Sequence, residues 1–313
     1  MAFDIRKAEA RLQNIQAVTP VLAALRTISL GSWRTSMTRS QHLTRYTDRL
    51  LALLPYLLPH TSVSRISGKR WLPFKREGDY VGDRPEGGSV VAVVLGSERG
   101  LCGQYNNVLI DRFASYLQKR EEEDAEISVI AFGSRLIREL QRQDYELDLT
   151  RALSVTRLPS YKLAREFVDR WLSDYESYAI DAVDMLYNAE VEAGDYEPTS
   201  FRLIPPSVSA SDIDHPSTVS LMDENQSRSV IIETDPVGIY ARIIKEWTIT
   251  TAYELMLEAA GTEHAARYQL MESATQNAEE LIETLSRDIK TGRRREITQE
   301  MQELAVAAGL LNG

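Results

Sequence analysis

The feature that most constrains this chain is a helical pattern without proline that runs from about residue 237 to about 308. Its side chains recur in steps of three and four, with one gap of seven, and most are apolar. The stripe consists of Leu255, Ala259, Ala266, Leu270, Ala274, Asn277, Leu281 and Leu285. Such steps place side chains on one face of a helix. The segment would span ~110 Å, so we predict a coiled-coil helix whose stripe faces another helix.

A second long helix is predicted over residues 1–58. Its stripe consists of Ala8, Leu12, Ile15, Val18, Leu22, Leu25 and Ile28, and it resumes at Leu43, Tyr46, Leu50, Leu53 and Leu57. Pro20 should kink this helix or restart it with Thr19 as the N-cap. Two long amphipathic helices that flank one compact domain most simply pair antiparallel, because each then covers the apolar stripe of the other.

The sequence between the helices predicts an α/β domain of Rossmann-like type. Apolar, β-branched runs at 90–95, 127–133, 153–159, 181–190, 199–206 and 230–236 read as strands. Helical patterns at about 105–120, 134–142 and 161–176 lie among them. Strands that alternate with helices indicate a largely parallel sheet. We therefore divide the chain into helix 1–60, loop or insert 61–89, α/β domain 90–236 and helix 237–313. The insert is either a surface loop or a brake on movement.

Charge is distributed unevenly along the chain. The net charge is −10, yet residues 1–80 carry 13 Lys and Arg against 5 Asp and Glu. An acidic protein binds nucleic acid poorly, so we expect no nucleic-acid partner, whereas a basic segment indicates a surface for another partner. The single cysteine excludes an internal disulfide framework. We find no apolar run long enough to span a membrane and no secretory signal at the start of the sequence.

The candidate sites lack the residues that catalysis would need. A glycine loop, SERGLCG at 97–103, follows the first strand and precedes a helix, but its spacing fits neither common phosphate-binding motif. Cys102 has no histidine near it in the sequence, and the four histidines are too scattered for a metal site. We expect no cofactor. An arginine cluster at 293–295 and an apolar end at 305–311 favour a helix surrounded by partner subunits.

Four short motifs, in the right order, resemble one known family. They are SERGLCG at 97–103, TEHAARY at 262–268, ATQNA at 274–278 and ITQEMQE at 297–303. These resemble the S-D-R-G-L-C-G, S-E-H/Q-A-A-R-M, A-T-x-N-A and I-T-x-E-I-x-E stretches of the γ subunit of F-type ATP synthase, the rotating central stalk. The resemblance covers both ends and the central domain.

The resemblance implies an antiparallel coiled coil that turns inside a ring of α and β subunits and transmits torque from the proton-driven c ring. The γ subunit performs no bond chemistry itself. By this resemblance, the hexamer contacts are Arg267, Arg293, Arg294, Thr298, Glu300 and Glu303. Contacts to the ε subunit and the c ring are Glu98, Arg99, Gly100, Cys102, Gly103 and Asn106. The complex would sit peripherally on the cytoplasmic face of a bacterial inner membrane or an equivalent membrane.

Two alternatives stay open at this stage. Arg294 stands where the family has a glutamine, and residues 18–29 lack the usual methionine-lysine character, which fits a γ-like paralogue as well as a housekeeping γ subunit. An α/β ligand-binding adaptor with coiled-coil arms is the alternative outside the rotary class.

Overall fold

A computed structural model describes residues 5–57, 88–153, 158–192, 194–206 and 232–307. The chain divides into two compact units, one made of residues 1–30 and 267–313 and the other of residues 31–266. Two helices, α1 (Ile5–Leu51) and α9 (Pro236–Ala307), contribute to both units. Most of the predicted insert lies outside the described residues, and the four-part division of the chain stays a prediction.

The larger unit is built on a five-stranded sheet in the order β3-β2-β1-β4-β5. The strands are β1 (Ser89–Leu95), β2 (Glu126–Phe132), β3 (Leu149–Arg151), β4 (Ala182–Glu190) and β5 (Tyr196–Ile204). Strands β1 to β4 run parallel, and β5 joins β4 antiparallel. The other helices within the described residues are α2 (Leu54–Leu57), α4 (Tyr105–Glu122), α5 (Ser134–Arg142) and α6 (Tyr161–Glu176). The predicted α/β class is confirmed.

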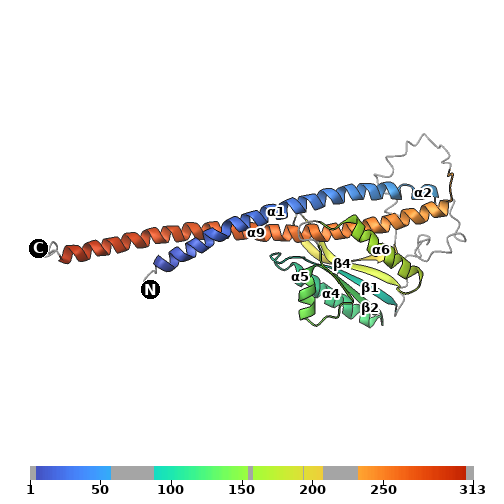
Figure 1. The fold of residues 1–313 in the computed structure, drawn as a ribbon, viewed down its shortest axis with the longest axis horizontal. Coiled ribbons are helices and arrows are strands. Elements are labelled where there is room, and N and C mark those ends of the chain that lie inside the picture. The colour runs from blue at the N-terminus through green and yellow to red at the C-terminus, as the bar shows by residue number, and fades with distance from the viewer. Residues whose placement is uncertain (1–4, 58–87, 154–157, 193, 207–231, 308–313) are drawn as a thin grey trace. The chain divides into compact units, whose positions relative to one another are not determined.

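Strand β1 is buried on both faces of the sheet. Ala92 and Val94 pack with α4 and α5, whereas Val91, Val93 and Leu95 pack with α6 and α9. Figure 1 shows α4 and α5 on one side of the sheet and α6 on the other. Because neighbouring side chains of a strand point to opposite faces, a strand covered on both faces needs a continuous apolar run. The run at 90–95 is such a sequence.

The third strand lies earlier than the sequence predicted. The prediction was 153–159, whereas β3 is Leu149–Arg151, an exposed edge strand paired with β2. Past β3, the Leu153 N–H donates to the carboxylate of Glu98 at 2.8 Å instead of to a strand. Pro159 has no N–H to offer a ladder, and residues 154–157 lie outside the described residues. The backbone at 153 is therefore engaged by a side chain.

The predicted strand at 230–236 is wrong for its described part. Residues 232–235 form neither helix nor strand, and α9 begins at Pro236. The Asp235 carboxylate accepts hydrogen bonds from the N–H groups of Val237 at 3.3 Å and Gly238 at 3.1 Å. An aspartate that caps the first turn, followed by proline at the first helical position, is a helix start signal.

Helices α1 and α9 run antiparallel in the larger unit. Thr44 donates to the Glu254 carboxylate at 2.6 Å, and Ser36 donates to the backbone oxygen of Leu257 at 2.6 Å. A Cβ on Gly261 would meet the Ser36 hydroxyl oxygen at 2.9 Å. The glycine thus lets the two helices approach closely.

The smaller unit consists of the remaining parts of the same two helices, also antiparallel. Arg26 pairs with Glu272 at 2.8 Å, and Arg293 pairs with Glu9. Low numbers on α1 thus meet high numbers on α9. The prediction of an antiparallel helix pair agrees with these contacts in each unit.

The contact stripe of α9 in the smaller unit is offset by one residue from the predicted stripe between 270 and 281, and the two coincide at Leu285. Leu270 and Leu281, which we expected to face α1, are 37% and 41% exposed. The residues turned inward step by four and three. They are Met271, Thr275, Ala278, Ile282, Leu285 and Ile289. The polar Thr275 tolerates burial because its hydroxyl donates to the backbone oxygen of Met271 at 2.7 Å.

Helix α1 differs from its predicted stripe in a similar way. Val18 and Ile28 are 51% and 63% exposed, whereas Ser29 is buried. The helix is not restarted at Pro20, and Thr19 is not an N-cap, because its hydroxyl donates to the Ile15 oxygen within the same helix at 2.8 Å. An inserted proline is thus accommodated inside α1.

Candidate functional site: the glycine loop and helix α9

The glycine loop, residues 96–103, connects β1 to α4. Leu101 and Gly103 have φ angles of 62° and 61°, in the left-handed region, where the chain turns. A Cβ on Gly96 would meet Leu136 of α5 at 2.5 Å. The loop therefore lies directly against α5, and the close packing leaves no room at Gly96 for a phosphate group.

The N-terminus of α5 is occupied by the side chain of Glu98. Its carboxylate accepts the Ser134 N–H at 2.9 Å, the Ser134 hydroxyl at 2.6 Å and the Leu153 N–H at 2.8 Å. A helix N-terminus offers unpaired N–H groups and a favourable field for an anion. The chain thus places its own carboxylate at a helix N-terminus that could otherwise bind an anion.

The amides of the glycine loop are bound by a second carboxylate. Glu263 of α9 accepts the N–H of Glu98 at 3.2 Å and the N–H of Arg99 at 3.5 Å, and it is 7% exposed. A buried carboxylate needs such donors, because its charge has lost contact with water. The loop is therefore bonded on one side to α9 and on the other to α5.

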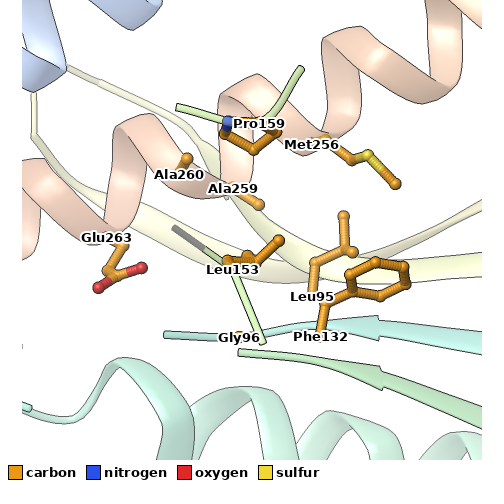
Figure 2. A pocket seen from close by; sticks show the side chains of 9 residues that line it. All are labelled: Leu95, Gly96, Phe132, Leu153, Pro159, Met256, Ala259, Ala260 and Glu263. Carbon is orange, nitrogen blue, oxygen red and sulfur yellow. The ribbon is translucent and has the colours of Figure 1, made fainter. Parts of the chain in front are cut away.

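A small apolar hollow lies beside this carboxylate. It is lined by Leu95, Gly96, Phe132, Leu153, Pro159, Met256, Ala259, Ala260 and Glu263. Figure 2 shows the Glu263 carboxylate at one end, apart from the Leu95, Phe132 and Met256 side chains. The lining carries no basic side chain, and its one charged group is negative. This chemistry does not suit the phosphates of a nucleotide.

A buried polar cluster joins α4, β4 and α9 next to the loop. The Tyr105 hydroxyl donates to the Ala259 oxygen at 2.7 Å and lies 3.2 Å from the Thr262 hydroxyl. The Asn188 side chain donates to the Tyr105 backbone oxygen at 2.8 Å, and the Thr262 hydroxyl donates to the Asn188 backbone oxygen at 3.0 Å. Burial raises the pKa of Tyr105, which keeps this hydroxyl protonated.

Two further carboxylates of α9 lie at the edge of the domain. Glu258 accepts the Glu190 N–H at 3.1 Å, and Glu254 accepts the Thr44 hydroxyl at 2.6 Å. Burial raises the pKa of both carboxyl groups, and neighbouring negative charges add to this effect. Helix α9 thus contacts β4 through Glu258 and α1 through Glu254.

The structure separates the six predicted loop contacts into two groups. Arg99 and Gly103 are exposed and Gly100 is half-buried. Glu98 is engaged within the chain, and Cys102 and Asn106 are 5% and 3% exposed. The Asn106 side chain accepts the Ser97 N–H at 3.0 Å. The first group can meet another subunit, whereas the second holds the loop in shape.

The six predicted contacts on α9 also divide. Arg267 is 6% exposed. The others are all exposed, and they are Arg293, Arg294, Thr298, Glu300 and Glu303. Ile297, Met301 and Leu304 beside them are 56%, 65% and 69% exposed. This end of α9 therefore presents apolar and charged side chains together.

Glu263 lies within the TEHAARY motif at 262–268, but no role was predicted for it from the sequence. The predicted stripe of α9 has its gap of seven between Ala259 and Ala266, and Glu263 lies four residues after the first and three before the second. A charged residue on a buried helical face requires a partner, and that was the available signal.

Within the described residues, no group of acidic, histidine or cysteine side chains is arranged to hold a metal ion. No described helix combines the length and the apolar character needed to cross a membrane. The fold and the site together define a coiled-coil protein with an α/β domain. The amides of its glycine loop are bound by Glu263, and the Glu98 carboxylate of the loop binds the start of α5.

Comparison with known proteins identifies the family. A family model described as ATP synthase matches residues 4–310. A curated ATP synthase gamma chain of Fusobacterium nucleatum is 26% identical over 98% of this chain and 99% of its own length. The ATP synthase gamma chain of Staphylococcus aureus strain JH9 is 22% identical over the same shares of the two chains.

Solved structures agree on the fold. A chain of the Euglena gracilis mitochondrial ATP synthase, in an OSCP, F1 and c-ring structure, aligns with a TM-score of 0.59 and 14% identity, and covers 98% of this chain and 94% of that one. A chain of the Tetrahymena thermophila mitochondrial central stalk and c ring aligns with a TM-score of 0.53 and 16% identity, and covers 81% and 99%. The protein belongs to the ATP synthase family, as a relative of its γ chains.

Proposed function

We propose that this chain is the central-stalk γ subunit of a proton-translocating F-type ATP synthase. It transmits torque between the membrane c ring and the catalytic α/β hexamer, during either synthesis or hydrolysis of ATP. The observation that carries this proposal is the 72-residue helix α9, paired antiparallel with α1, in a chain matched to the family over residues 4–310. Such a helix is about 108 Å long. In this proposal the β subunits catalyse the reaction, and this chain has no catalytic role.

The exposed end of α9 is the proposed contact with the hexamer. It carries Arg293, Arg294, Thr298, Glu300 and Glu303, all exposed. Arginine offers several donors in a rigid fork and suits carboxylate partners. Apolar side chains between these charges, such as Met301, fit an enclosing protein surface better than water. Arg267 does not belong to this surface, because it is buried in the chain.

The exposed part of the glycine loop is the proposed contact with the ε subunit or the c ring. It consists of Arg99, Gly100 and Gly103. Through these partners the protein is peripheral to the membrane, on the cytoplasmic face of a bacterial inner membrane or its equivalent. Cross-linking from an Arg99→Cys variant distinguishes the candidate partners, since adducts with ε or c support this contact and adducts with β alone would overturn it.

Copurification and proton pumping test the proposed function. The chain is expressed with the α, β and ε subunits and the c ring, and the complex is placed in vesicles. A rotor subunit elutes with α and β, and its omission abolishes ATP-driven proton uptake. A ligand-binding adaptor would elute apart from α and β, and the vesicles would pump protons without it. Equilibrium dialysis of the isolated chain with ATP adds an independent check, because the filled glycine loop predicts no binding.

A further inference from the structure

We propose that Glu263 is the positioning residue that fixes the glycine loop to helix α9, so that loop and helix turn together. This inference rests on the proposed function, in which torque passes between the α/β domain and the helices. The two oxygens of Glu263 bind two successive loop amides, Glu98 N at 3.2 Å and Arg99 N at 3.5 Å. A single side chain of α9 thereby holds the backbone of the glycine loop in the α/β domain.

The connection continues from the loop into the sheet. The residue whose N–H is held by Glu263 is Glu98, and the carboxylate of Glu98 binds Ser134 of α5 and Leu153 beyond β3. Two carboxylates in series thus join α9, the loop and the carboxyl ends of the parallel strands. Hydrogen bonds to an ionised acceptor are stronger and more directional than neutral ones, so this path resists displacement of the loop.

Burial makes the link specific for a carboxylate. Glu263 is 7% exposed, so water does not take the place of a hydrogen bond that this side chain loses. The loss of such a bond is therefore costly. A glutamine at 263 would present one oxygen and one NH₂ group to two N–H donors. One loop amide would then face another donor. An aspartate would keep the charge but, one methylene shorter, would not reach both amides.

The loop tip depends on this link. Arg99, which Glu263 holds through its N–H, is exposed, and so are Leu101 and Gly103 just beyond it. Both of these have positive φ angles. Buried Cys102 holds the far side of the tip, and Glu263 holds its first residues. Glu263 therefore positions the part of the loop that is available to a partner subunit.

The test compares Glu263→Gln and Glu263→Asp with a matched control, Glu272→Gln. Glu272 lies on the same helix, pairs with Arg26 and has a side chain that is 33% exposed. Amide hydrogen exchange is measured on the full-length chain. We expect the amides of 98 and 99 to exchange roughly tenfold faster in both Glu263 variants. Exchange in β1 and in the control should match that of the wild type.

Coupling is measured on the reconstituted complex as protons pumped per ATP hydrolysed. The Glu263 variants should hydrolyse ATP but lose at least half of the pumping ratio, whereas Glu272→Gln keeps it. If Glu263→Gln does not fold, Glu263→Asp carries the same expectation. Unchanged exchange at 98 and 99, or an unchanged pumping ratio, in the folded variants would overturn the proposal. Failure of the wild-type chain to join the complex would count against the proposed function alone, since the exchange result stands by itself.

Discussion

Asp184 of β4 and Arg202 of β5 form a two-point ion pair across the antiparallel edge of the sheet. The Asp184 carboxylate accepts the Nε and Nη2 hydrogens of Arg202 at 2.5 and 2.8 Å. Tyr116 and Arg120 of α4 donate to the same carboxylate at 2.7 and 3.3 Å. Asp184 is 3% exposed, so this buried acid accepts hydrogen bonds from two guanidinium groups and a hydroxyl, and Arg120 pairs with Glu123 as well, at 2.5 Å.

Replacement of Asp184 by asparagine should therefore be strongly destabilising. The change removes the anion that Arg120 and Arg202 share. Because Arg120 keeps its pair with Glu123 and the Arg202 side chain is 28% exposed, the loss of unfolding free energy should lie at the lower end of the range of about 3–5 kcal/mol that removal of one member of a buried pair costs. Urea denaturation at pH 7 measures this loss. Glu166→Gln is the control, because its pair with Lys162 is exposed and should contribute less than about 1 kcal/mol. Equal midpoints for the two variants would contradict this account of the cluster.

The observed register of α9 predicts opposite results for two nearby residues. Ile289 is 6% exposed and Leu281 is 41% exposed. Ile289→Ala should cost about 2–5 kcal/mol through lost packing and a cavity, whereas Leu281→Ala should cost less than about 1 kcal/mol. The two are compared by urea denaturation of the full chain. A larger loss from Leu281→Ala would restore the register predicted from the sequence.

Glu258 should make the stability of the chain depend on pH. Burial is the main cause that raises the pKa of Glu258 in the folded state. Its contribution to stability is therefore complete below the unfolded-state pKa of about 4.3 and is lost as pH rises through the folded-state pKa. Glu258→Gln mimics the protonated form and can still accept the Glu190 N–H. The variant should match the wild type near pH 4 and exceed it at pH 7. Urea titrations at both pH values measure the difference, and a variant less stable at pH 7 would refute the sign.

The arginines near the end of α9 should matter for coupling and not for folding. Arg293 and Arg294 are exposed, so Arg293→Ala with Arg294→Ala should leave the urea midpoint nearly unchanged, apart from the loss of the Arg293–Glu9 pair. In the reconstituted complex, ATP hydrolysis or its coupling to proton pumping should fall, and more so at low salt, where the wild-type contact is strongest. Full hydrolysis and full coupling in the double variant would show that these arginines lie on a solvated face.

The sequence was sufficient to predict the helices and strands whose residue pattern is determined by burial. The β-branched run at 90–95 became β1, since a strand covered on both faces admits only apolar side chains. Both long helices were evident because a stripe in steps of three and four persists over many turns. The antiparallel pairing followed from the need of each stripe for a cover.

The errors arose where polar groups decide the local structure. The stripe of α9 was misplaced by one residue between 270 and 281, where Thr275, a polar residue, lies on the buried face. The third strand was misplaced because Glu98 captures the Leu153 N–H across a distance in sequence that no periodicity reveals. The start of α9 was read as a strand end, although an aspartate before a proline is a helix cap. No role was predicted for Glu263, although its place on the buried face of α9 signalled that it needs a partner, because the pattern does not say which groups it binds.

Direct observation of rotation is the measurement that tests the central claim most closely. The hexamer is fixed to a surface through its β subunits, and a bead is attached at Lys162→Cys on α6, where the native side chain is 85% exposed. Cys102, 5% exposed, should not compete for the label. The account predicts rotation of the bead in one direction when ATP is added and no rotation without ATP. A complex that contains this chain and hydrolyses ATP while the bead stays fixed would contradict it.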